Sequence, residues 1–205
     1  MSLYANNGTL IAINDNWKDT QQAEIEATGI APTNDLESAI VATLDPGTYA
    51  TALIGKDNGV GTGLNEIYDL DSESSVITAI GARDNALTGD DVVFSGFIVT
   101  GTQPQSFLLR ALGPSLTSYG VAEALADPQL QLYEGSTTLI AINDNWRGAQ
   151  EAEIIATGIP PTNDLESAIL VTLNPGAYTM VVAAIKVGLV SHSPKFTLCL
   201  IAAIS

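Results

Sequence analysis

The stretch LIAINDNW occurs twice in the chain, at Leu10–Trp17 and at Leu139–Trp146, and it ends in carboxylate and amide side chains. Calcium in proteins is held by six to eight oxygen ligands, which Asp, Glu and Asn supply. Further acidic residues follow each copy in the stretch PTNDLES. The candidate calcium ligands are Asp15, Asn16, Asp35 and Glu37 in the first copy and Asp144, Asn145, Asp164 and Glu166 in the second.

The same residues have a second interpretation, because Asn and Asp side chains often hydrogen-bond to nearby backbone groups. Asn14, Asp15 and Asn16 would then cap the end of a strand and the helix that follows, and Trp17 would close the edge of a sandwich. The spacing of the acidic residues matches no EF-hand loop. Calcium is the candidate cofactor, and the sequence points to no other.

Other patterns that could do chemistry each lack a necessary part. GPSLT at Gly113–Thr117 lacks the second glycine of a nucleophile elbow. GVGTG at Gly59–Gly63 lacks the helix that a phosphate-binding loop opens. The single histidine, His192, lies in a loop-like stretch, and the single cysteine, Cys199, lies in an apolar run that is typical of a buried strand. We expect no enzymatic activity.

Two further residues could bind something. Asn7-Gly8-Thr9 is a glycan acceptor sequence, although Asn-Gly also favours a tight hairpin turn. Arg110 interrupts the apolar run FLLRALG, where a partly buried guanidinium needs carboxylate or carbonyl partners. We expect Arg110 to form a structural ion pair with an Asp of the repeated sequence.

The charge of the chain limits its partners. Seven Lys and Arg residues against 23 Asp and Glu residues give a net charge of −16. Such a surface repels phosphate backbones and anionic lipids, so nucleic acid and membrane surfaces are poor partners. No apolar run is long enough to span a bilayer, and the sequence shows no signal peptide.

The repeat extends well beyond the opening phrase. Leu3–Tyr49 aligns with Leu132–Tyr178 without a gap, and 33 of 47 positions are identical, which indicates duplication of a structural unit. The single central block, roughly Ser75–Gln131, has no second copy after Tyr178. The sequence therefore predicts an incomplete first repeat over residues 1–74 and a more complete unit over residues 75–205.

Short strands separated by turns make up most of the chain. TLIAIND, LQLYEG, ESAIVATL, TYATALIG and GLNEIYDLD read as strands, as do SSVITAIG, DDVVFSGFIVTG, SFLLRALG and KFTLCLIAAIS. DTQQAEIEATG, with Asp19 as a possible cap, and its second copy GAQEAEIIATG each predict one short helix. The expected fold is all-β, with two jelly-roll-like antiparallel β-sandwich lobes and one short helix in each.

Three phrases together resemble a known module. FLLRALGPSL, ALADPQLQLYEGSTTLIAINDNW and EIIATGIPPTNDLESAILVTLNPGAYT are similar to a repeat module of secreted bacterial surface proteins, which is built like the pre-peptidase C-terminal β-sandwich. The resemblance implies an extracellular or cell-surface location and an adhesive or structural role. It carries no catalytic residues to this chain.

An unequal repeat suggests assembly. An incomplete sandwich leaves a sheet edge unpaired, and unpaired edges bind strands of other chains. We expect the subunit of an extracellular bacterial filament, a helical homo-polymer that grows head to tail by β-strand addition. The terminal segments MSLYA and FTLCLIAAIS are the expected donor strands. The alternative is a calcium-supported adhesion or carbohydrate-binding module of a secreted protein.

Overall fold

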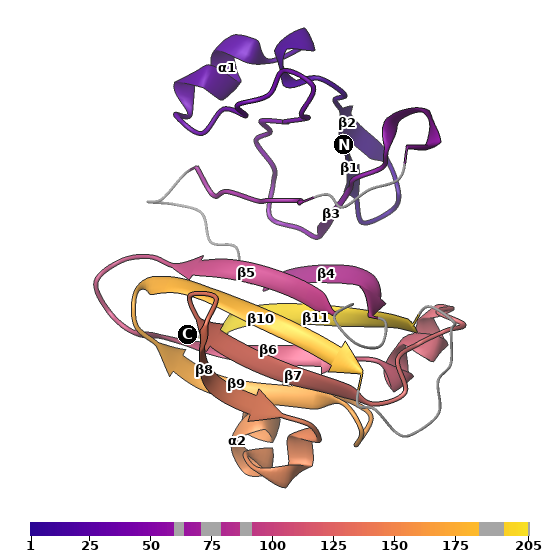
Figure 1. The fold of residues 1–205 in the computed structure, drawn as a ribbon, viewed down its shortest axis with the longest axis vertical. Coiled ribbons are helices and arrows are strands. Elements are labelled where there is room, and N and C mark those ends of the chain that lie inside the picture. Colours follow the sequence, from indigo (N-terminus) through magenta and orange to yellow (C-terminus); the bar gives the residue numbers. More distant parts are fainter. Residues whose placement is uncertain (60–63, 71–78, 87–91, 185–194, 205) are drawn as a thin grey trace. The chain divides into compact units, whose positions relative to one another are not determined.

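The computed structural model describes residues 1–59, 64–70, 79–86, 92–184 and 195–204, and for residues 79–86 and 195–204 it describes the backbone. The chain divides into two compact units, Met1–Val76 and Ile77–Ser205, which we call unit 1 and unit 2. Each unit contains one copy of the repeat. The fold is all-β with one short α-helix in each unit (Figure 1).

Unit 2 is a sandwich of two four-stranded antiparallel sheets. The strands of one sheet follow the order β5 (Val93–Val99), β10 (Gly176–Ala184), β7 (Pro128–Glu134) and β8 (Thr138–Asn143). The strands of the other follow the order β4 (Ala79–Ala86), β11 (Lys195–Ile204), β6 (Gln105–Leu112) and β9 (Ser167–Leu173). Among these strands only the β7–β8 connection stays within one sheet, so the central block and the second repeat interleave in both layers.

The core of unit 2 lies between these sheets. Alternate residues of β5, β7 and β10 face inward, as expected for period-2 side chains. The central block contributes Phe107, Leu109 and Ala111 from β6, and the repeat contributes buried residues such as Leu132 and Tyr178. A single core is therefore built from both parts of the sequence.

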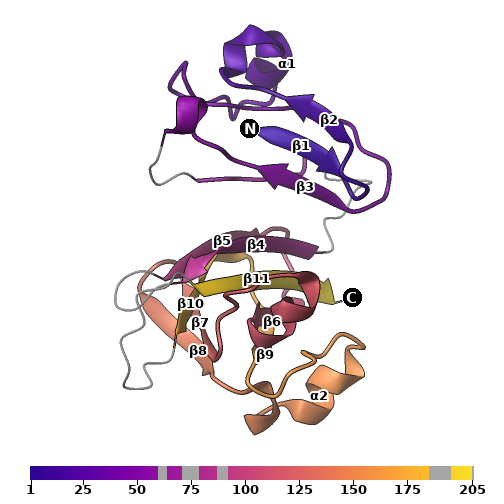
Figure 2. The same ribbon diagram turned by 90° about the vertical axis from the view of Figure 1, so that its right-hand side faces the viewer.

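Strand β6 is covered on its second face as well. Leu108 packs with Trp146, with Ile154 of the helix α2 (Glu151–Ala156) and with Ala168 of β9. This double burial explains why the run FLLRAL is almost continuously apolar rather than alternating. Figure 2 shows α2 beside β9 and β6, on the outside of the sandwich.

The described residues of unit 1 form one three-stranded antiparallel sheet. Its strands are β2 (Leu10–Ile13), β1 (Ser2–Ala5) and β3 (Tyr49–Ala52), with β1 in the middle. The predicted Asn-Gly hairpin joins β1 to β2, where Gly8 has a φ of +80° and its N–H donates to the Ala5 carbonyl. The arrangement repeats that of β8, β7 and β10 in unit 2.

The short helices end where the sequence predicts but begin later. Helix α1 spans Gln22–Ala27, and Asp19 instead ends a 3₁₀ turn at Trp17–Asp19. Gly29 and Gly158 follow the two helices with φ of +75° and +77°, a conformation that favours glycine.

Two strand predictions in unit 1 are wrong. ESAIVATL at residues 37–44 has no strand, although the matching Ser167–Leu173 forms β9. Strand β9 pairs with β6, and no strand in the described part of unit 1 pairs with residues 37–44. The described residues of GLNEIYDLD, 64–70, also form no strand.

The terminal segments are not free donors, contrary to the sequence-based expectation. MSLYA supplies β1, which pairs with β2 on one side and β3 on the other. The described residues of FTLCLIAAIS, 196–204, lie in β11, which pairs with β4 and β6. The predictions for the Cys199 side chain and for His192 lie outside the described residues.

Candidate functional site

The polar phrase after each repeated strand anchors a later segment of the same unit. In unit 1 the Asn14 side-chain oxygen accepts from the Ala39 N–H at 3.1 Å, and its amide donates to the Asn16 carbonyl at 3.0 Å. In unit 2 Asn143 accepts from the Ala168 N–H at 3.0 Å. The first Asn of the phrase therefore binds the local turn in both copies, but no side chain caps the helices that follow.

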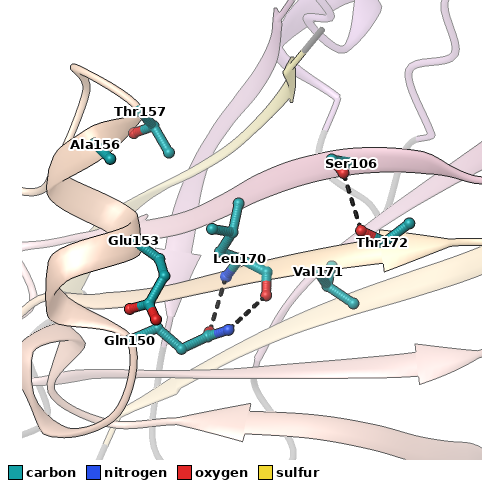
Figure 3. Close-up of a pocket in the computed structure, with 8 residues that line it drawn as sticks. All are labelled: Ser106, Gln150, Glu153, Ala156, Thr157, Leu170, Val171 and Thr172. Atoms are coloured by element: carbon teal, nitrogen blue, oxygen red, sulfur yellow. Dashed lines mark hydrogen bonds between the residues drawn. The ribbon is translucent and has the colours of Figure 1, made fainter.

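A glutamine before each helix binds the same segment two residues further along the chain. Gln21 accepts from the Val41 N–H at 3.1 Å and donates to the Val41 carbonyl at 2.8 Å. Gln150 binds both backbone groups of Leu170 in the same way, at 3.1 and 2.9 Å (Figure 3). A side chain thus pairs with the strand segment as a neighbouring strand would, a role that the sequence analysis missed.

The PTNDLES loop also has one conformation in both units. Trp17 donates its backbone N–H to the Glu37 carbonyl at 2.8 Å, as Trp146 does to Glu166 at 2.9 Å. The Asn34 N–H donates to Glu37 Oε2 at 3.3 Å, as Asn163 does to Glu166 Oε2 at 3.3 Å. One carboxylate oxygen of each Glu therefore closes its own loop.

The other carboxylate oxygen distinguishes the units. Glu166 Oε1 accepts from the backbone N–H groups of Gly113 and Ser115, at 3.1 and 3.0 Å, and from the Ser115 hydroxyl. The Glu166 side chain is fully buried against the turn that follows β6. Glu37 is exposed, and no described residue donates to its Oε1. The Leu-Gly-Pro-Ser turn thus explains the buried Glu166.

The apolar residues beside this loop follow the same contrast. Leu44 is 39% exposed, whereas its counterpart Leu173 is 4% exposed. Leu53 is 45% exposed, whereas its counterpart Val182 is fully buried. Tyr49 and Thr51 are half-buried, and their counterparts Tyr178 and Met180 are buried in the core of unit 2. We call Leu44, Tyr49, Thr51 and Leu53 the open face of unit 1.

Little else in unit 1 is buried. Among its described residues, the buried apolar side chains are Leu3, Trp17 and Ile25. The buried core clusters formed by the described residues of the chain lie in unit 2. A unit of this size needs a larger core to be stable alone.

The predicted calcium ligands of unit 1 are engaged separately. Asp15 forms an ion pair with Lys56, and Asp35 forms one with Lys18 at 2.5 Å. The Asn16 side chain donates to Asp19 at 3.1 Å. Glu37 lies in the loop described above.

The predicted ligands of unit 2 are also dispersed. Asp164 lies 2.6 Å from Arg147, and Asn145 uses its backbone carbonyl to accept from Asn143. Glu166 binds the turn, and Asp144 has a buried oxygen without a hydrogen bond in the structure. Among the described residues, no group of three or more His, Cys, Asp or Glu side chains is placed to hold a metal ion. Calcium binding stays a prediction.

Asp127 is an ionisable residue that the sequence analysis missed. One of its oxygens is buried without a hydrogen-bond partner in the structure, as is one of Asp144. Burial raises the pKa of Asp127, and the nearby negative charge of Asp144 raises it further. Asp127 lies in the run ALADPQL. Nothing in that run indicates that its carboxylate is close enough to Asp144 for their charges to interact.

Arg110 has a carbonyl partner instead of the expected Asp. Its guanidinium donates to the Ile159 carbonyl at 2.9 Å, and the ion pairs among described residues do not include it. Burial lowers the pKa of Arg110, while the Glu166 carboxylate opposes that shift. Arg110 thus links β6 to the segment after α2.

An open depression lies between α2 and the strands β6 and β9 (Figure 3). It contains one ionisable side chain, Glu153, and no aromatic side chain. This composition supplies neither a pair of acid–base groups nor a stacking surface. The lining residues are Ser106, Gln150, Glu153, Ala156, Thr157, Leu170, Val171 and Thr172.

Two surface features complete the description. Asn7 is exposed at the β1–β2 turn, and its side chain accepts from the Thr9 N–H at 3.0 Å. Glycosylation there stays a prediction. Within the described residues, no helix has the length and apolar character needed to cross a membrane.

Comparisons with known proteins give matches among solved structures. No family model matches the chain, and no curated protein matches it. The crystal structure of the pre-peptidase C-terminal domain of collagenase from Bacillus anthracis matches with 12% sequence identity and a TM-score of 0.35. The match covers 60% of this chain and 87% of that domain.

Proposed function

We propose that this protein is the structural subunit of an extracellular bacterial filament, in which neighbouring copies join head to tail by β-strand addition. The proposal rests on one contrast between the units. Unit 1 repeats the β8-β7-β10 part of a sheet, but none of its described residues forms a strand at the position that β5 occupies beside β10. Among these residues, its sheet therefore ends at β3, with no strand paired to the outer edge of β3.

Unit 2 offers a strand that suits this position. In the described part of the chain, β5 pairs with β10 on one side and has no partner strand on the other. Its sequence, VFSGFIV, contains neither a charge nor a proline, the residues that commonly block edge-to-edge pairing. Phe94 and Ile98 of this strand are 65% and 70% exposed.

The pairing of β10 with β5 inside unit 2 supplies the antiparallel strand direction, and the proposed contact uses the other, free edge of β5. Residues 176–182 pair with 99–93 in antiparallel order. The matching residues of unit 1 are 47–53, which include β3 and the exposed Leu53. In the proposed contact, β5 of one copy runs antiparallel to β3 of the next, and backbone hydrogen bonds supply the affinity.

The contact joins two different surfaces, β3 of unit 1 and β5 of unit 2. Such a heterologous contact leaves a free β5 at one end of a growing assembly and a free β3 at the other. It propagates into an open helical filament unless its rotation closes a ring. The low count of positive charges and the exposed apolar edge are consistent with polymerisation outside the cell.

The proposal is tested by electron microscopy and sedimentation velocity of the purified chain over a range of concentrations. We expect fibres whose amount rises with concentration. The double variant Phe94→Lys/Ile98→Lys should stay monomeric, because charges on an edge strand disfavour pairing.

The matched control is Ile142→Lys on β8, at the opposite edge of the same sheet. Ile142 is 54% exposed, so it tests the effect of an added lysine without altering β5. This variant should polymerise like the parent chain. A parent chain that remains monomeric at every concentration, or a double variant that forms fibres normally, would refute the proposal.

A further inference from the structure

We infer that the PTNDLES loop of unit 1, with the open face beside it, is a receptor for a strand of a partner polypeptide that ends in a Gly-Pro-Ser turn, and that Glu37 accepts the hydrogen bonds of that turn. This surface includes one face of β3, from Tyr49 and Thr51, whereas the proposed filament contact uses the hydrogen-bonding edge of that strand. The inference therefore goes beyond that function and does not depend on it.

The receptor loop is already formed without an occupant. The sequence PTNDLESAI is identical in the two units, at residues 32–40 and 161–169. The Leu36 N–H donates to Asn34 at 3.0 Å, as the Leu165 N–H does to Asn163 at 3.0 Å. The backbone bond from Glu37 to Asn34 has a length of 3.1 Å, against 3.2 Å for Glu166 to Asn163. Glu37 is thus held as Glu166 is.

The segment that would pair with the partner strand is also held in place. Asn14 anchors Ala39, and Gln21 binds both backbone groups of Val41, as their counterparts do in unit 2. These anchors lie on the side of the segment away from the missing strand. Residues 38–41 therefore need little ordering before a strand pairs with them, which favours binding.

The unit also shows where contacts are missing. Glu37 Oε1 has no donor among the described residues, whereas Glu166 Oε1 has three. The exposed Leu44 lies where its counterpart is covered. Together these groups describe a polar end and an apolar body for one extended ligand.

Unit 2 indicates which residues such a ligand needs, because its own β6 and the turn after β6 occupy the surface that corresponds to the open face of unit 1. The strand places apolar residues at alternate positions, Phe107, Leu109 and Ala111, against the sheet. Its Arg110 donates to the Ile159 carbonyl, for which unit 1 offers Ile30. The partner segment is therefore an apolar strand with one central basic residue, followed by Gly-Pro-Ser.

A second folded copy of this chain does not supply the segment. In unit 2, β6 lies between β11 and β9, and its turn is bound by Glu166. Moving β6 and its turn to unit 1 of another copy would uncover an equal surface in the donor, so the exchange would bury no additional area. The occupant is a different polypeptide that presents such a strand unpaired.

The test uses the full chain and a synthetic peptide with the sequence QSFLLRALGPSLTS, which is that of residues 105–118. Isothermal titration calorimetry should show one peptide bound per chain. Glu37→Gln should weaken binding about tenfold, since hydrogen bonds to a charged acceptor are roughly twice as strong as neutral ones. The control Glu26→Gln, on the exposed face of α1, should bind like the parent chain.

A variant of the peptide provides a test that leaves the protein unchanged. Replacing the serine that corresponds to Ser115 by proline removes both its N–H and its hydroxyl, and it should weaken binding at least as much as Glu37→Gln. Hydrogen exchange should show protection of residues 38–44 when the peptide is bound. An undetectable interaction, or binding equally strong with Glu37→Gln, would overturn the inference. Fibres of the parent chain without peptide binding would leave the filament proposal intact, and binding without fibres would do the opposite.

Discussion

The backbone N–H of Gly113 donates to the Glu166 carboxylate at 3.1 Å, across 53 residues of sequence. This bond joins the central block to the second repeat at the end of β6. The first repeat carries the same glutamate, Glu37, in the same loop, but the chain has no second turn to bind it. The repeat thus supplies strands to both sheets of a sandwich, and the central block adds further strands to both sheets in unit 2.

Replacing Glu166 by glutamine should destabilise unit 2, because a buried charged acceptor loses strength at three hydrogen bonds. We expect the free energy of unfolding to fall by about 2 kcal/mol. Urea unfolding followed by near-ultraviolet circular dichroism measures the change. Glu37→Gln is the matched control, and it should change the stability by less than about 0.5 kcal/mol because Glu37 is exposed. An equal loss in both variants would contradict the assignment.

Gly113→Ala should also destabilise unit 2. A Cβ atom at this position would lie 2.1 Å from the backbone oxygen of Leu125, so the turn or its neighbour must move. Such overpacking costs about 1–3 kcal/mol, which would appear as a lower Tm in calorimetry. The control is Gly96→Ala on β5, where the nearest atom is 3.8 Å away and the strand should be unaffected or slightly stabilised. A Tm for Gly113→Ala equal to that of the parent would show that the turn is loosely packed.

Hydrogen exchange should separate the two copies of one sequence. Residues 167–173 pair with β6, so their amides should exchange slowly, at a rate set by unfolding of unit 2. Residues 38–44 have no partner strand among the described residues, so most of their amides should exchange at least about tenfold faster. Mass spectrometry of peptic fragments measures both segments in one experiment. Equal protection in both segments would mean that residues 38–44 pair with a strand in solution.

Asp127 should make unit 2 less stable as the pH rises. Its pKa is raised in the folded state, by burial first and by Asp144 second. The folded state therefore binds the proton more readily than the unfolded state, so stability falls as the pH rises from the ordinary Asp pKa through the raised value. Asp127→Asn should remove this part of the pH dependence and raise the urea midpoint at pH 7. A variant with the same slope between pH 4 and 7 as the parent chain would exclude Asp127 as its origin.

Local features of this protein could be predicted from the sequence. The Asn-Gly hairpin at Gly8, the helix ends at Gly29 and Gly158, and the strands of unit 2 depend on backbone preferences and on short-range patterns. Such preferences act within a few residues, so they are visible in the letters themselves. The duplication was visible for the same reason, since it requires only a comparison of the sequence with itself.

Partners across long sequence distances were decided by the tertiary structure. ESAI begins a strand in one unit and not in the other, although its residues are identical, because a strand forms only where another strand pairs with it. Arg110 donates to a carbonyl instead of a carboxylate, and Glu166 accepts from the turn that follows β6. The sequence by itself determined which segments could become strands. The pairing of those strands, and the surface that unit 1 leaves uncovered, followed from hydrogen bonds and apolar contacts that only the folded chain brings together.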